Sequence, residues 1–66
     1  MGVREQWWHE LSHREQDTRL GNAMKVAMSP GSWSQTDIRR AVQVIRLSGH
    51  VSVADRLSGF LNEKER

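Results

Sequence analysis

Two histidines four residues apart are the part of this 66-residue sequence whose residue types and spacing could carry out chemistry. Residues 9–13 read His-Glu-Leu-Ser-His, and two imidazoles separated by one helical turn can bind one zinc ion. The intervening Glu10 would then be placed to polarise a water molecule bound to the metal. The pattern predicts a zinc site if His9 and His13 share a helix face and a third ligand is supplied by Asp17, His50, Glu63 or Glu65.

These five residues resemble the zinc-binding motif of zinc peptidases, and the similarity ends at His13. The zinc helix of those enzymes is buried and continues with uncharged and hydrophobic residues, whereas Arg14 and Glu15 follow here. A chain of 66 residues also leaves little room for a substrate cleft. We therefore interpret His9 and His13 as solvated residues on a polar helix face, with zinc binding as a minor alternative. We expect no cofactor and no enzyme activity.

The composition limits the class of protein. The chain has no cysteine, 36% hydrophobic and 27% charged residues, and a net charge of +2. The lack of cysteine excludes disulfides and thiol sites and favours a reducing compartment, so we expect a cytoplasmic protein. No apolar run approaches the roughly 18 residues of a membrane span, and we expect no membrane association. A domain of this size buries only about 60% of the surface of its unfolded chain, so its core is marginal.

Apolar residues recur at helical spacings, which predicts an all-α fold for a single small domain. We expect an N-terminal amphipathic helix over residues 1–28, broken near Gly21, and a turn over residues 29–33. A second helix is expected over residues 34–48 and a third over residues 52–64.

The expected helix ends depend on three local signals. Ser34 with Asp37, and Ser52 with Asp55, have the spacing of capping boxes, in which the serine oxygen accepts an early backbone N–H. Gly49 follows the second apolar stripe and can adopt the left-handed conformation that ends a helix.

The apolar residues of the first 28 positions fall on two faces. One stripe runs from Val3 to Leu11 and the other from Leu20 to Met28. Leu20 comes nine positions after Leu11, which puts the two stripes about half a turn out of phase. One straight helix cannot bury both stripes. Either the N-terminal piece folds back as a separate helix, or it presents its tryptophans to another molecule. We expect a small three-helix bundle, or a helical hairpin completed by dimerisation.

The adjacent tryptophans are the expected contact residues. Trp7 and Trp8 point about 100° apart on a helix and cannot both face one narrow stripe, and tryptophan is a favoured anchor at protein interfaces. We expect Trp7, Trp8 and Leu11 to anchor a partner or a second copy of the chain, with Arg14 and Arg19 on the polar rim. The expected function is that of a small regulatory protein, of prokaryotic, phage or plasmid type, that modulates a larger protein by direct binding.

A stretch in the second half supports an alternative. Residues 49–60 resemble the helix-turn-helix of Fis-type and enhancer-binding bacterial regulators, whose usual run is G-N-V-S-x-A-A-R-L-L-G-I. The matching positions are Gly49, Val51, Ser52, Ala54, Arg56, Leu57 and Gly59. The resemblance implies that a turn begins at Gly59 and leads into a recognition helix. Only residues 60–66 remain to form that helix. The same residues also fit one continuous helix.

Positive charge is concentrated near this stretch. From residue 38 to residue 56 there are four arginines and one aspartate, and such a surface can bind phosphates. The alternative function is therefore a DNA-binding regulator whose contacts come from Arg39, Arg40, Arg46, His50 and Arg56. A solvated helix face accounts for the same arginines equally well.

Overall fold

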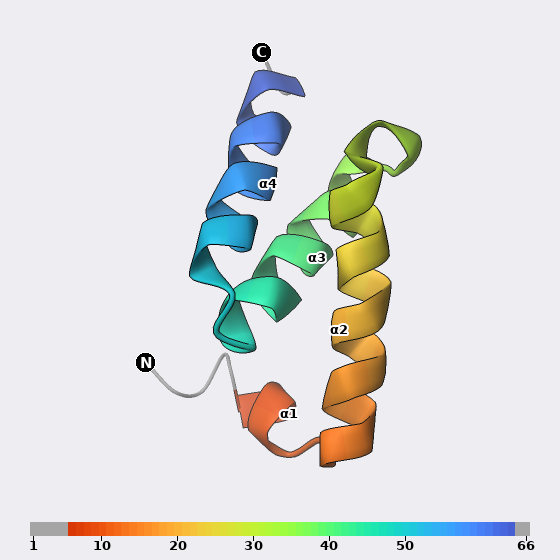
Figure 1. Ribbon diagram of the computed structural model, residues 1–66, viewed down its shortest axis with the longest axis vertical. Coiled ribbons are helices and arrows are strands. Elements are labelled where there is room, and N and C mark those ends of the chain that lie inside the picture. Colours follow the sequence, from red (N-terminus) through yellow and green to blue (C-terminus); the bar gives the residue numbers. More distant parts are fainter. Residues whose placement is uncertain (1–5, 65–66) are drawn as a thin grey trace.

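The computed structural model describes residues 6–64, and all of its regular elements are helical (Figure 1). The α-helices are α1 (Gln6–His9), α2 (His13–Met28), α3 (Gln35–Leu47) and α4 (Val51–Lys64), and a 3-10 helix, η2 (Pro30–Ser32), connects α2 to α3. The expectation of an all-α fold is confirmed. Val3 of the N-terminal stripe and the candidate ligand Glu65 lie outside the described residues. None of the helices in residues 6–64 combines the length and the apolar character that crossing a membrane requires.

α3 is the central helix, with α2 and α4 packed on it and in little contact with each other (Figure 1). Its face carries Ile38 and Ile45, which are fully inaccessible to solvent. The neighbouring helices add further buried residues to the same core, namely Ala23, Val26, Ala54, Leu57 and Leu61. This arrangement belongs to the small helical bundles that the apolar stripes predict.

The first helical segment breaks at Ser12, and α2 continues through Gly21 without interruption. The Ser12 hydroxyl accepts the backbone N–H of Glu15 (3.2 Å), and the Glu15 carboxylate accepts the backbone N–H of Ser12 (3.0 Å). This capping box satisfies two N–H groups at the start of α2 and fixes Ser12 in an extended conformation. The expected break near Gly21 is wrong, because an interior glycine costs a helix only about 1 kcal/mol and does not end it.

The break turns α1 back onto the core. Trp8 is 5% exposed and belongs to the core, against which Trp7 and Leu11 also pack. The side-chain amide of Gln16 donates a hydrogen bond to the Trp8 carbonyl oxygen at 2.8 Å, which ties α1 to α2. Of the two arrangements that the out-of-phase stripes allow, the fold-back is the one observed.

α3 has the ends that the sequence predicts. Ser34 is its N-cap and accepts the backbone N–H of Asp37 at 3.2 Å. Gly49 has φ +99°, the only positive φ among the described residues. The N–H groups of Gly49 and His50 return to carbonyls in the last turn of α3, both at 3.1 Å, which is the Schellman arrangement.

The expected cap of the third helix, Ser52 with Asp55, is not formed. α4 begins at Val51, and its first hydrogen bond runs from the Ala54 N–H to the His50 carbonyl at 3.1 Å. Ser52 therefore lies inside the first turn, because the chain enters α4 directly after the glycine. The Asp55 carboxylate pairs instead with Arg46 of α3 at 3.2 Å.

Candidate functional site

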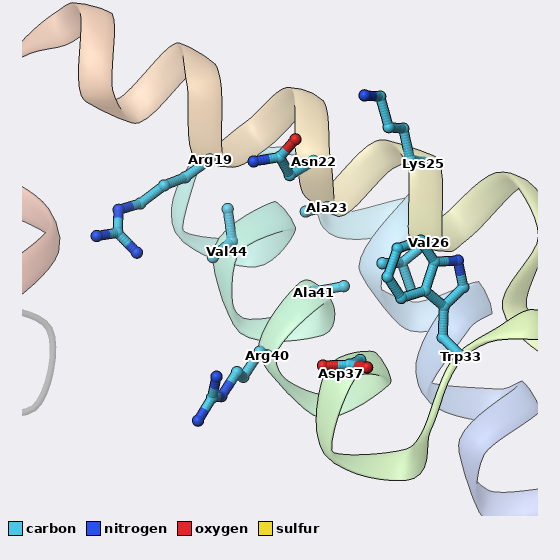
Figure 2. A pocket seen from close by; sticks show the side chains of 10 residues that line it. All are labelled: Arg19, Asn22, Ala23, Lys25, Val26, Trp33, Asp37, Arg40, Ala41 and Val44. Carbon is cyan, nitrogen blue, oxygen red and sulfur yellow. The ribbon is translucent and has the colours of Figure 1, made fainter.

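A groove of about 430 Å³ lies along the junction of α2 and α3, and we call it the α2–α3 groove. Its floor consists of Ala23 and Val26 from α2 and of Ala41 and Val44 from α3, all of them buried. Trp33, in the segment before α3, stands at one end (Figure 2). The groove exists because these floor residues are small, which leaves space above the contact between the helices.

The rim of the groove is cationic. Arg19 and Lys25 of α2 and Arg40 of α3 line it together with one acid, Asp37, so that cations exceed acids by two. Figure 2 shows Arg19 and Arg40 on opposite walls, both extending away from the Trp33 end. The Asp37 carboxylate accepts a hydrogen bond from the Ser34 hydroxyl at 3.0 Å, which holds it at the start of α3.

Arg19 also connects the groove to α1. Its guanidinium carbon lies 5.8 Å from the centroid of the Trp7 ring, within the range of a cation–π contact. Trp7 packs edge-to-face on Trp8, with ring centroids 5.9 Å apart and an interplanar angle of 82°. Arg19 thus links the rim of the groove to the pair of tryptophans in α1.

The five residues expected to contact a partner lie in different surroundings. Trp8 is buried in the core of its own chain and has almost no surface left for a partner. Trp7 and Leu11 are half-buried against the same core. Arg14 is exposed in the first turn of α2 and does not line the groove. Arg19 alone of the five belongs to the groove.

The structure does not bring the expected nucleic-acid-binding residues into one pocket. Arg40 lines the α2–α3 groove, whereas Arg56 lines a separate cleft of about 200 Å³ between the end of α2 and α4. Arg46 is engaged in its ion pair with α4. Arg39 and His50 are exposed and line neither cavity.

α4 does not contain the turn that the helix-turn-helix resemblance implies. It runs through Gly59 to Lys64, because Leu57 and Leu61, one helical turn apart on either side of the glycine, are both buried in the core. The resemblance over residues 49–60 thus corresponds to one continuous helix after the Gly49 turn.

The histidine pair does not have the geometry of a zinc motif. His9 ends α1 and His13 begins α2, so the break at Ser12 separates them and they do not lie on one helix. In the part of the chain that the structure describes, no three His, Cys, Asp or Glu residues are grouped so that they could hold a metal ion.

The groove is also lined by three residues that were not among the expected site residues, Lys25, Trp33 and Asp37. A signal was present in the spacing, since the lining residues of each wall recur at helical intervals, as Arg19 with Ala23 and Arg40 with Val44. The path of the chain between the helices, which brings Trp33 to the groove, has no comparable signal.

Comparisons with protein families, curated proteins and solved structures gave no match. What the groove binds must therefore be inferred from its own residues.

Proposed function

We propose that the protein is a small helical binding module that modulates a larger protein by contact and without catalysis, and that the partner occupies the α2–α3 groove. The observation that supports this proposal is the combination of an apolar floor and a cationic rim in a groove of about 430 Å³. Binding sites are usually concave and largely apolar, with a few polar groups that orient the ligand.

In this proposal Trp7 and Trp8 contribute to partner binding indirectly, through their contacts within the chain. Trp8 anchors α1 in the core, and Trp7 contacts Arg19 on the groove rim. The contact surface expected at the N-terminus is thus replaced by a groove whose shape α1 supports. The cytoplasmic location and the prokaryotic, phage or plasmid character expected from the sequence remain part of the proposal.

The same packing bears on the oligomeric state that we propose. Trp8 and Leu11 pack on the core of their own chain, which removes the physical reason for expecting a core completed by dimerisation. The large apolar side chains left exposed in residues 6–64 are Met28 and Trp33 near the α2–α3 turn and Val51 at the start of α4. A stable interface buries about 800 Å² on each partner, which such separated residues do not provide. We propose a monomer as the binding form. A molar mass near 7.6 kDa supports it, and twice that mass supports the dimer.

Site-specific photo-crosslinking tests where the partner binds. A photoreactive phenylalanine analogue replaces Asn22 on the groove rim or, as a matched control, the exposed Gln43 of α3, which does not line the groove. In cells that produce the full chain, the Asn22 position should give a protein adduct of defined mass, and the Gln43 position should not. Equal adducts at both positions contradict the proposal. Adducts with nucleic acid alone favour the DNA-binding alternative.

A further inference from the structure

The charge and shape of the groove indicate the kind of segment that fits it. We propose that its occupant is an acidic segment of the protein partner, with a carboxylate bound between Arg19 and Arg40 and an apolar side chain on the floor beside Trp33. This inference rests on the proposed function, because it specifies the chemistry of the same site.

The two arginines line the same groove. They come from opposite walls and extend in the same direction (Figure 2). Among the described residues, Arg40 has no hydrogen-bond or ion-pair partner. The guanidinium carbon of Arg19 lies 5.8 Å from the centroid of the Trp7 ring, and a cation–π contact uses none of the hydrogen-bonding capacity of the guanidinium for a protein acceptor. Guanidinium groups bind carboxylates through paired charge-assisted hydrogen bonds, so an acidic side chain is the complementary ligand.

The acids near these arginines are already hydrogen-bonded within the chain. Glu15, one turn before Arg19, accepts the backbone N–H of Ser12. Asp37 accepts the Ser34 hydroxyl at the start of α3. Three cations and one acid line the groove, so an incoming carboxylate meets an excess of positive charge there.

The apolar floor favours a peptide with at least one hydrophobic side chain. The groove volume of about 430 Å³ lies in the range of about 300–1,000 Å³ typical of sites for small ligands, which admits a few side chains but not a second helix along its whole length. Trp33 is 38% exposed and offers its ring as a wall for such a side chain.

A protein segment fits this groove better than a nucleic acid does. Asp37 lies on the rim, where its carboxylate can accept a backbone N–H from a peptide, a donor that a phosphodiester backbone lacks. The floor of alanine and valine provides apolar contact and no hydrogen-bonding groups that could read a base edge.

The test uses peptides selected on the whole protein. A random library of short peptides is displayed on phage and selected on the intact chain. The most enriched peptide is then synthesised with its own sequence and with every Asp and Glu changed to Asn and Gln. We expect the enriched sequences to combine Asp or Glu with Leu, Phe or Trp, and the amide version to bind about tenfold more weakly. Arg40→Ala should weaken the acidic peptide by about the same factor, and the matched control Arg56→Ala should leave it unchanged.

The outcomes separate this inference from the proposed function. Equal affinity of the acidic and amide peptides, with crosslinks still specific to Asn22, overturns the acidic occupant and leaves protein binding at the groove intact. Absence of any enriched sequence, or binding unaffected by Arg40→Ala, also overturns the inference. Tighter binding of a single-stranded DNA oligonucleotide that is lost in Arg40→Ala replaces both proposals with nucleic-acid binding.

Discussion

Arg19 and Trp7 are in contact where α1 meets α2, with the guanidinium carbon 5.8 Å from the ring centroid. Because Arg19 also lines the α2–α3 groove, one side chain joins the packing of α1 to the rim of the candidate site. α1 is only four residues long and has little intrinsic helical stability, so its position depends on this contact and on the burial of Trp8.

Replacing the two adjacent tryptophans should therefore have unequal effects on stability. Trp8→Ala should lower the free energy of unfolding by about 3–5 kcal/mol, because it empties a buried site. Trp7→Ala should cost less, since Trp7 is half-buried and its cation–π contact is worth about 0.5–1 kcal/mol. Urea unfolding followed by circular dichroism measures both. A Trp8→Ala variant as stable as the wild type would mean that Trp8 is exposed.

The glycines should respond to alanine with opposite signs. Gly49→Ala should destabilise the protein by about 1–2 kcal/mol, because φ +99° is unfavourable for an L-residue with a Cβ. Gly59→Ala lies inside α4 with open space around the added methyl group and should stabilise the protein by about 0.5–1 kcal/mol. Thermal unfolding of the two variants shows whether α4 is continuous at Gly59 or contains a turn there. Destabilisation by Gly59→Ala would indicate a turn at that residue.

The elements that the sequence predicts well are those set by local signals. The stripe containing Ile38 and Ile45 fixes the inner face of α3, and Ser34 and Gly49 set its ends through hydrogen bonds to nearby residues in the chain. The break at Ser12 also has a local signal in Glu15 three residues later, although the polar run around it has no apolar stripe to indicate a helix.

The candidate groove was less predictable, because it depends on contacts between distant residues. That Ala23 and Ala41 face each other across two helices follows from tertiary packing and not from either helix alone. The surroundings of the tryptophan pair were hard to predict for the same reason, since the burial of Trp8 depends on the fold-back of α1.

The three serines that precede acids by three residues should differ in their contribution to stability. Ser12→Ala and Ser34→Ala should each cost about 1 kcal/mol, because each removes a hydroxyl that caps a helix. Ser52→Ala should change stability by less than about 0.5 kcal/mol, since Ser52 lies inside the first turn of α4. Chemical unfolding at neutral pH measures all three, and a loss at Ser52 equal to that at Ser34 would contradict the start of α4 at Val51.

The capping box at the start of α2 should make stability depend on pH. The hydrogen bonds from the Ser12 backbone N–H and hydroxyl lower the pKa of Glu15 below its ordinary value of 4.5, and the charge of Arg19 acts in the same direction. Because the pKa is lower in the folded state, this stabilisation is present above the pKa of the unfolded chain and is lost as the pH falls through the folded value. Glu15→Gln should therefore show a smaller loss of stability between about pH 6 and about pH 3 than the wild type. Identical pH profiles would show that Glu15 is not hydrogen-bonded in solution.

One NMR titration tests whether the α2–α3 groove is the binding site. The selected acidic peptide is added to the isotopically labelled full chain, and the changes in amide chemical shift are mapped onto the residues. The largest changes are expected on residues 19–26 of α2 and residues 37–44 of α3, together with the indole N–H of Trp33. Changes centred on Val53, Arg56 and Phe60 in the cleft beside α4, or spread evenly over the chain, would contradict binding in the groove.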